Sequence, residues 1–271
     1  MTVDEAYAEV IAVTRREAKN FAYGIMVLPR AKRRAIAAIY AFARQVDDVA
    51  DGDRSVEEKR ARLEELRTSL DALPTDAMSL ALHDARARFG IPRDALAALV
   101  DGGLQDLQQS TYADFAELRG YCEKVAGAVG LACVPVYGSH DTEHAPTYAL
   151  ELGIALQLIN IMRDVGEDLG LGRIYLPQDE LERFGVGEFA PTPEFRALMA
   201  FQAERARAQL AEGLKLLDSL DRRSSLCVAT FAGLYRGQLE RMERNGFDVF
   251  SQDCRLSAPA KLAVVARSLF A

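Results

Sequence analysis

Two clusters of oxygen-bearing side chains have the spacing of a single helix face. In YAFARQVDDVADG, Asp47 and Asp51 are four residues apart, so both project from the same face of a helix. In LQLINIMRDVGEDLG, Asn160, Asp164 and Asp168 follow one another at four-residue steps. Like charges at this spacing destabilise an isolated helix by about 0.2–0.5 kcal/mol per pair, and apolar surroundings increase the cost. The two clusters therefore predict a bound cation.

Mg²⁺ is the cation best suited to such ligands. It binds a few carboxylate oxygens and completes its shell with water and substrate phosphate oxygens. An arginine stands shortly before the acids of each cluster, Arg44 in the first and Arg163 in the second, and arginine contacts phosphate oxygens well. A single cluster would be better explained as a solvated face neutralised by its arginine. Two clusters together favour a diphosphate held between metal ions.

Helices must position these clusters, because apolar residues recur at spacings of three and four along almost the whole chain. Alternating runs of β-branched residues are missing, so we expect a nearly all-α protein. Ser55, with Glu58 three residues later, forms a capping box that predicts a helix start. The predicted helices span residues 31–51, 55–73, 92–109, 113–137, 147–169, 192–220 and 224–244. Short breaks, and the lack of repeats or low-complexity linkers, predict a single domain over residues 1–271.

The bulk composition excludes several classes of protein. The 271 residues are 49% hydrophobic, which is sufficient for one large helical core. The net charge of −7 and a pI near 5.2 argue against binding of nucleic acid, which needs a basic face. The four cysteines contain no CxxC pair, so we expect buried, reduced thiols in a cytoplasmic protein.

No segment has the pattern of an export signal or a membrane span. The first residues, MTVDEAYAEVIAVTRRE, carry acids where a signal peptide has a basic start and an apolar core. The longest apolar stretch, residues 149–162, contains Glu151, Gln157 and Asn160, which disqualifies it as a span. The C-terminal KLAVVARSLF could rest weakly on a membrane as an amphipathic helix, although packing on the core is favoured. We expect at most peripheral membrane contact.

At the two acidic segments the chain resembles the squalene and phytoene synthase family, the head-to-head prenyl synthases. The similarity is carried by YAFARQVDDVAD and by NIMRDVGEDLGLGRIYLP, in the expected order. It also runs through NFAYGIMVLPRAKRRAI, YCEKVAGAVG and YRGQLERMERNGFDVF, so nearly the whole chain is covered. The resemblance implies an all-α isoprenoid-synthase fold, a single-domain helical bundle with a central cavity. It also implies three Mg²⁺ ions shared between the two motifs and the substrate diphosphates.

The resemblance implies roles for individual residues. The metal ligands would be Asp47, Asp51, Asn160, Asp164 and Asp168. Diphosphate would be held by Lys19, Asn20, Tyr40, Arg44 and Arg163, and the substrate region would be lined by Gln157, Tyr121 and Tyr235. The four aspartates and Tyr121 would be catalytic, and the proton acceptor would be either Tyr121 or the released diphosphate. Many relatives have His-Ser-Lys-Ser at residues 17–20 and Cys at position 43, where this chain has Glu-Ala-Lys-Asn and Ala.

The implied reaction joins two allylic prenyl diphosphates. Mg²⁺ would act as a Lewis acid on one diphosphate so that the allylic C–O bond ionises, and an apolar cavity would keep the carbocation from water. The double bond of the second substrate then attacks, and loss of a proton closes a cyclopropane. The segment AKNFAYGIMVLP and the short chain are most similar to presqualene diphosphate synthases of squalene and hopanoid biosynthesis, which use two farnesyl diphosphates. Phytoene synthases of carotenoid biosynthesis, which use two geranylgeranyl diphosphates, are the alternative.

Other functions remain open at this point. A catalytically silent helical assembly subunit is opposed by the intact aspartates. A head-to-tail elongating enzyme would carry DDxxD on both helices, whereas the second motif here is NxxxDxxxD. No NADPH is expected, because the pair Gly170 and Gly172 lacks the full GxGxxG and a preceding strand. The expected partners are prenyl diphosphates and downstream isoprenoid enzymes.

Overall fold

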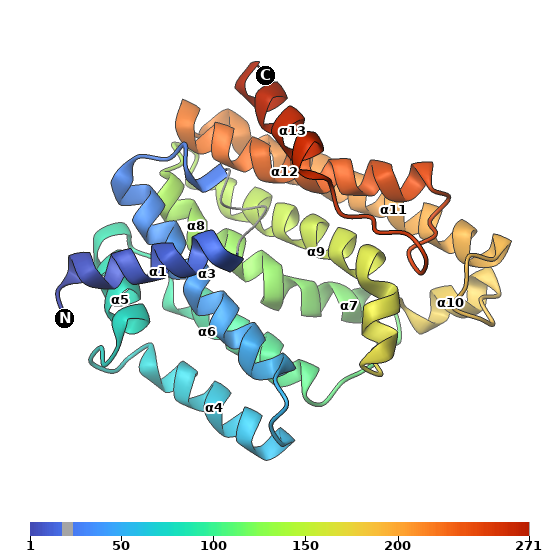
Figure 1. Ribbon diagram of the computed structural model, residues 1–271, viewed down its shortest axis with the longest axis horizontal. Helices are drawn as coiled ribbons and strands as arrows, with labels where there is room; N and C mark the ends of the chain where they lie inside the picture. The colour runs from blue at the N-terminus through green and yellow to red at the C-terminus, as the bar shows by residue number, and fades with distance from the viewer. Residues whose placement is uncertain (18–23, 271) are drawn as a thin grey trace.

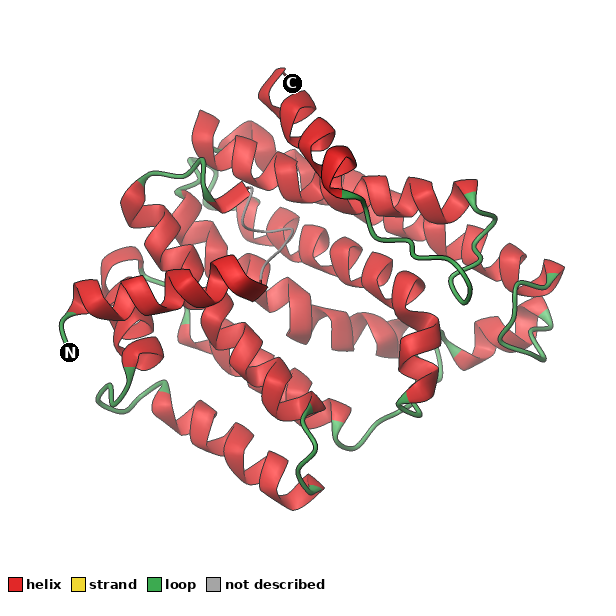
Figure 2. Cartoon of the chain, in the orientation of Figure 1, coloured by secondary structure: helices red, strands yellow, loops and turns green. Residues whose placement is uncertain are grey.

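The computed structural model describes residues 1–17 and 24–270, with side chains described through residue 267. Within these ranges all regular elements are helices joined by loops, and no strand is present apart from one isolated bridge between Thr111 and Ile174 (Figures 1 and 2). The helices are α1 (Val3–Glu17), α3 (Arg30–Asp51), α4 (Val56–Ser69), α5 (Ala77–Phe89), α6 (Arg93–Asp106), α7 (Phe115–Cys122), η1 (Glu123–Gly127), α8 (Ala128–Tyr137), α9 (Ala145–Gly170), α10 (Gln178–Phe184), α11 (Pro193–Leu214), η2 (Lys215–Ser219), α12 (Arg222–Arg244) and α13 (Ala258–Phe270). The all-α prediction is confirmed.

The long amphipathic helices were predicted closely, whereas three other helices were not. The predicted starts and ends of α3, α9 and α12 lie within two residues of the observed ones. The capping box is also confirmed, because the Ser55 side chain accepts a hydrogen bond from the backbone of Glu58 at the start of α4. Helices α1, α5 and α10 were not predicted, whereas the C-terminal KLAVVARSLF, considered as an amphipathic helix, lies in α13. In α5 most of the buried side chains are alanines, and small side chains give a weak periodic signal.

The predicted helix over residues 113–137 is interrupted by a π-helical turn, η1. The segment after it approaches α9 closely because both partners carry glycine. A Cβ atom on Gly130 would lie 2.3 Å from the backbone oxygen of Ala149, and one on Gly153 would lie 2.4 Å from that of Ala126. Only glycine is tolerated at such distances, so YCEKVAGAVG sets how near α8 and α9 lie.

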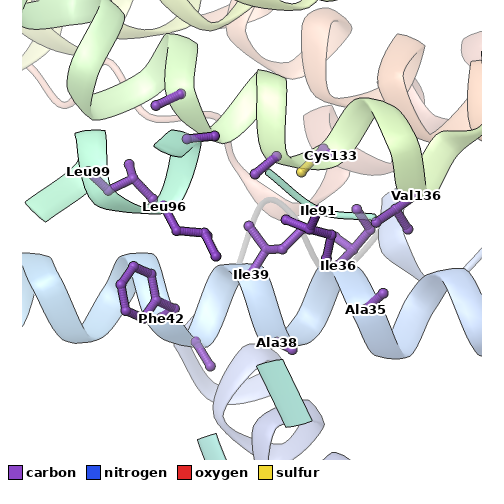
Figure 3. Packing of buried hydrophobic residues seen from close by; sticks show 14 of the residues in the cluster. Ala35, Ile36, Ala38, Ile39, Phe42, Ile91, Leu96, Leu99, Cys133 and Val136 are labelled. Atoms are coloured by element: carbon purple, nitrogen blue, oxygen red, sulfur yellow. The ribbon is translucent and has the colours of Figure 1, made fainter. Parts of the chain in front are cut away.

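The helices pack around α9 and α3. Helix α9 lies against α8 on one side and against α11 and α12 on another, as Figure 1 shows. Helix α3 packs on α5, α6 and α8. Figure 3 shows this part of the core, where Ile36, Ile39 and Phe42 of α3 meet Leu96 of α6 and Val136 of α8.

Cysteines and possible membrane segments agree with the sequence-based expectations. All four cysteines are buried and free. No helix in the described ranges combines the length and the apolar character that crossing a membrane requires. Helix α13 packs on α12 and lies across it in Figure 1. Leu262 of α13 remains 56% exposed, so this helix is only loosely covered.

Candidate active site

The predicted metal ligands from both acidic segments line one cavity of about 400 Å³. Asp47 and Asp51 come from α3, and Asn160, Asp164 and Asp168 come from α9. The four-residue spacing places each set on the helix face that is turned toward the cavity. The structure therefore brings together, from two helices more than 90 residues apart in the chain, the five side chains that the sequence predicted.

A second, apolar cavity of about 250 Å³ continues from the first. The two share lining residues, namely Ala43, Asp47, Val125, Gln157 and Asn160. Three residues predicted for the substrate region or the diphosphate, Tyr40, Gln157 and Tyr235, all line the apolar cavity. Its deeper walls carry aliphatic side chains and Phe231. An apolar slot whose one charged lining residue, Asp47, lies at the end shared with the acidic cavity suits a prenyl diphosphate.

Asp47 and Asp51 repel each other at the mouth of this slot. The Asp47 side chain is exposed to water in the cavity, but protein surrounds it on the walls. This partial desolvation, followed by the charges of Asp51 and Asp48, raises the pKa of Asp47 to about 7. The ionised form of Asp47 is therefore unfavourable in the metal-free protein.

On the opposite wall, the ionised form of Asp168 is likewise unfavourable. Desolvation, followed by the charge of Asp164, raises the pKa of Asp168 to about 7. Carboxylates on both walls therefore resist ionisation unless a positive charge lies between them. A divalent cation bound there would supply that charge.

The amide of Asn160 supports this interpretation. Its nitrogen donates to the side chain of Gln157 at 3.4 Å, whereas its side-chain oxygen is buried and accepts no hydrogen bond within the described ranges. The described residues contain no group of three or more His, Cys, Asp or Glu arranged to hold a metal alone. Mg²⁺ needs only one or two carboxylates when substrate phosphates and water complete its shell. The oxygen-only donor set fits Mg²⁺ together with a diphosphate.

Arginines lie around the carboxylates and pair with them. Arg163 donates to Asp164 at 2.8 Å and to Gln238 at 2.7 Å. Arg44 pairs at 2.6 Å with Asp48, the neighbour of the predicted ligand Asp47. These guanidinium groups already lie beside the mouth of the slot, where diphosphate oxygens would compete with the carboxylates for them.

Sequence reasoning missed two further arginines at this end. Arg173 pairs at 2.9 Å with Asp51 of the opposite wall. Arg255 reaches Glu167 at 2.8 Å and Asp164 at 3.5 Å. In each pair the partners lie at least 88 residues apart, so no local spacing could reveal them. Arg173 lies in the RIYLP end of the second family motif, but the resemblance assigned this arginine no role.

A cluster of tyrosines around Asp106 was also missed, apart from Tyr121. Tyr121 donates to one carboxylate oxygen of Asp106 at 2.9 Å, and Tyr175 donates to the other at 3.0 Å. The ring of Tyr112 lies against both, with centroids 5.4 and 5.7 Å away. Burial raises the pKa of Asp106, although the two hydroxyls partly oppose this. Asp106 stands alone in GGLQDLQ, so no local spacing indicated its partners.

Tyr121 is buried and retains its proton. Burial, followed by the charge of Asp106, raises the pKa of Tyr121 well above its ordinary value. Tyr121 and Asp106 both line the acidic cavity, so a hydroxyl fixed by hydrogen bonding faces the region between the two walls. Two other predicted substrate-binding residues, Lys19 and Asn20, lie outside the described residues.

Comparisons with known proteins show the family of this chain. The family model for squalene/phytoene synthase matches residues 14–260. A phytoene synthase of Mycobacterium tuberculosis is 41% identical over 277 residues, covering 98% of this chain and 91% of that protein. A 15-cis-phytoene synthase of Synechococcus elongatus is 38% identical over 269 residues, covering 92% of this chain and 87% of that protein.

Solved structures show the same architecture. A dehydrosqualene synthase in complex with a ligand superposes with a TM-score of 0.92 at 26% identity, covering 99% of this chain and 96% of that one. A squalene synthase of Alicyclobacillus acidocaldarius gives a TM-score of 0.84 at 27% identity, covering 91% of this chain and 96% of that one. The isoprenoid-synthase fold implied by the sequence motifs is confirmed. The chain belongs to the squalene/phytoene synthase family of prenyltransferases.

Proposed function

We propose that the protein joins two molecules of geranylgeranyl diphosphate head to head in a Mg²⁺-dependent reaction, as a phytoene synthase. The observation that carries the reaction type is the placement of oxygen ligands on two facing helices at the mouth of an apolar slot. The 41% identity to a phytoene synthase supports the longer substrate. Condensation of farnesyl diphosphate to presqualene diphosphate, which the wording of the sequence motifs favoured, becomes the second candidate. Similarity to squalene and dehydrosqualene synthases at 27% and 26% identity supports it.

The carboxylates and arginines would fix the diphosphate groups at the mouth. Asp47 and Asp51 on one wall, with Asn160, Asp164 and Asp168 on the other, would hold Mg²⁺, which supplies Lewis-acid activation of the allylic diphosphate when bound. Arg163 and Arg173 would exchange their present carboxylate partners for phosphate oxygens. The leaving diphosphate would thereby be held by fixed positive charge.

The apolar slot would protect the allylic cation from water. Ile36, Leu156 and Phe231 are among its lining residues. Eleven residues separate Ile36 from Asp47 on α3, and eleven separate Ala149 from Asn160 on α9. At 1.5 Å per helical residue each wall extends roughly 16 Å from the carboxylates. A prenyl chain bound along these walls would place its reacting carbons at the polar end and its tail among aliphatic side chains.

The proton released on ring closure is better accepted by the departing diphosphate than by Tyr121. Burial and the adjacent Asp106 raise the pKa of Tyr121, which makes deprotonated Tyr121 rare and keeps its hydroxyl a hydrogen-bond donor. We assign Tyr121 the role of positioning groups at the mouth through its fixed hydroxyl. Diphosphate held by Arg163 and Arg173 would be the base.

Product analysis tests the proposal. Purified protein is incubated with Mg²⁺ and either geranylgeranyl or farnesyl diphosphate, with and without NADPH, and the products are identified by chromatography and mass spectrometry. Phytoene from geranylgeranyl diphosphate without NADPH is the expected result. Presqualene diphosphate or squalene formed more efficiently from farnesyl diphosphate would establish the second candidate. Failure to condense either substrate, by protein shown to be folded, would overturn the proposal.

A further inference from the structure

A second charged surface lies at the opposite end of α3 from the carboxylates. An open pocket of about 550 Å³ is lined by Arg30 and Arg33 at the start of α3, by Arg222 and Arg223 at the start of α12, and by apolar residues. Its apolar members are Met26, Val27, Leu28, Pro29 and Leu226. We call these nine residues the basic end. Arg30 and Asp51 mark the two ends of α3, which at 1.5 Å per residue are about 31 Å apart.

The positive charge of this surface is not compensated by neighbouring acids. Arg30, Arg33, Arg222 and Arg223 form no ion pair with any residue that the structure describes. The nearest helix-start acid, Asp221, is occupied: it accepts from Lys32 at 2.5 Å and from two backbone amides of α12. Asp4 likewise pairs with Arg34 at 2.7 Å. Four available guanidinium groups therefore gather on one surface of a chain whose net charge is −7.

The requirements of helix stability do not explain these arginines. The first turns of α3 and α12 contain no acidic residue, although acids are favourable at a positive helix terminus. The N-cap of α12 is the acid Asp221, whose carboxylate is already bonded to Lys32 and to backbone amides. Instead the first turn of α3 contains Arg30 and Arg33, and the first turn of α12 contains Arg222 and Arg223. Basic residues at these places add to the positive potential of the helix ends. The surface attracts anions at some expense to helix stability.

The centre of the basic end is apolar and accessible. Met26 is 49% exposed, and Val27 and Leu226 are half-buried beside it. A patch of apolar side chains surrounded by arginines is amphipathic in the manner of membrane-surface sites, where apolar groups enter the acyl boundary and cations contact lipid phosphates. A nucleic acid would also contact the arginines, but it would offer no apolar contact to the exposed side chain of Met26.

The basic end is also next to the apolar slot. Ile25 lines the slot, whereas its neighbour Met26 lines the basic end. On α12, Val228 lines the slot and Leu226 lines the basic end. Packing here is tight, because a Cβ atom on Gly24 would lie 2.5 Å from the ring of Phe231. Among the described residues, the 24–28 segment and the start of α12 therefore contribute to both the slot and this surface.

We propose that the basic end docks on the surface of an anionic lipid bilayer. The lipid phosphates contact the four arginines, and Met26 with its apolar neighbours enters the boundary of the acyl region. This partner rests on the proposed function, because prenyl substrates and hydrocarbon products partition into bilayers. It places the deep end of the slot beside the membrane and the metal-binding mouth toward water. The contact surface thereby differs from α13, whose sequence offered a weak membrane contact but favoured packing on the core.

Flotation of the full-length protein with lipid vesicles tests the surface. The wild type is expected to float with vesicles of phosphatidylcholine mixed with phosphatidylglycerol, but not with phosphatidylcholine alone, and to be released by salt. The exposed pair Arg222→Glu/Arg223→Glu should weaken binding by at least about tenfold, because two attractive charges become repulsive. Glutamate is favourable in the first turn of a helix, so the variant should fold. Met26→Ser should weaken binding less.

The control variant is Arg60→Glu/Arg62→Glu, which makes the same charge change at exposed positions of α4. It should bind vesicles as the wild type does. The proposal is wrong if the wild type does not float, if the two double variants lose binding equally, or if binding is lost in Leu262→Glu of α13 and kept in Arg222→Glu/Arg223→Glu. Preference for a duplex oligonucleotide over anionic vesicles would also overturn it.

Failure of this proposal can be distinguished from failure of the proposed function. Condensation is measured separately with substrate in detergent micelles, where Arg222→Glu/Arg223→Glu should retain the wild-type rate because neither arginine lies near the carboxylates. Vesicle binding without condensation would refute the reaction and leave the docking surface intact. Condensation without vesicle binding would refute the docking surface and leave the reaction intact.

Discussion

The two ends of α3 carry opposite charges in different surroundings, one inside a cavity and the other at the surface. Asp47 and Asp51, near its C-terminal end, face further carboxylates across a cavity, and the pKa of Asp47 rises to about 7. Arg30 and Arg33, at its N-terminal end, lie in an open pocket at the surface. Carboxylates that repel one another inside a cavity are unfavourable without a cation, whereas arginines at the surface are readily solvated. Chemistry is therefore expected at the first end and reversible association at the second.

The largest predicted effect concerns the carboxylates of the two walls. Asp47→Asn on α3 and Asp164→Asn on α9 should each lower the rate of condensation on the order of a hundred- to a thousandfold, because each removes charge that holds Mg²⁺ and diphosphate. Product formation under saturating substrate is the measurement. Asp48→Asn is the matched control in the same motif.

Asp48 is exposed and does not line the cavity, although its partner Arg44 does. An exposed pair contributes little, so we expect a loss of less than about fivefold. If Asp48→Asn reduced the rate as much as Asp47→Asn, the assignment of the cavity-facing side of α3 would be wrong.

A smaller effect is expected from the tyrosine cluster. Asp106→Asn should lower the rate roughly ten- to a hundredfold, because the hydroxyls of Tyr121 and Tyr175 would lose their fixed partner and groups at the mouth would be misplaced. Rates are compared alongside thermal unfolding of each variant. Tyr112→Phe is the control, since the Tyr112 hydroxyl is buried and bonds to no described residue. Equal losses in both variants would show that packing alone matters here.

The metal-free protein should become less stable as pH rises. Asp47 and Asp168 keep a proton up to about pH 7 in the folded state, whereas in the unfolded chain they release it near their ordinary value of about 4. The folded state therefore binds more protons across this window, and the free energy of unfolding falls from about pH 4 to about pH 7. Urea unfolding in a chelator should show this fall.

The double variant Asp47→Asn/Asp168→Asn isolates the contribution of these two groups. Its stability relative to the wild type should increase between about pH 4 and about pH 7. A difference between the two proteins that stays constant with pH would contradict the shared repulsion at the mouth.

The smallest effect is expected from Asp221, the N-cap of α12 beside the basic end. Asp221 accepts from the amides of Arg223 and Ser224 at 2.9 and 3.1 Å. Although burial opposes it, bonding to Lys32 and Ser224 holds the pKa of Asp221 well below its usual range. Asp221→Ala should cost about 1–2 kcal/mol of unfolding free energy through loss of the helix cap, with no change in condensation rate. A large loss of activity at unchanged stability would contradict the separation of the two ends.

Local spacing is what made the carboxylate walls predictable. Helices α3 and α9 have a continuous apolar periodicity, and their acids lie at four-residue steps on a single face. Such patterns depend only on residues close in sequence, so the side chains that they place on one helix face share that face in the folded protein. The facing of α3 and α9 across a cavity followed from the family resemblance and was confirmed by the structure.

Contacts distant in sequence could not be predicted in this way. The pairing of Arg173 with Asp51 spans 122 residues, and Tyr175 reaches Asp106 across 69. The basic end is a further example, because the arginines of α12 adjoin Met26 only after the bundle has formed. Helix α5 was missed for a different reason: its core face is mainly alanine.

Binding of a ligand that cannot react tests most directly whether both walls act together. Thermal unfolding is followed with Mg²⁺, with inorganic diphosphate, and with both. The wild type should gain stability chiefly when both are present, and this gain should disappear in Asp47→Asn and equally in Asp164→Asn. If either variant kept the wild-type gain, one helix alone would hold the metal and diphosphate, and the clamp between α3 and α9 would be contradicted.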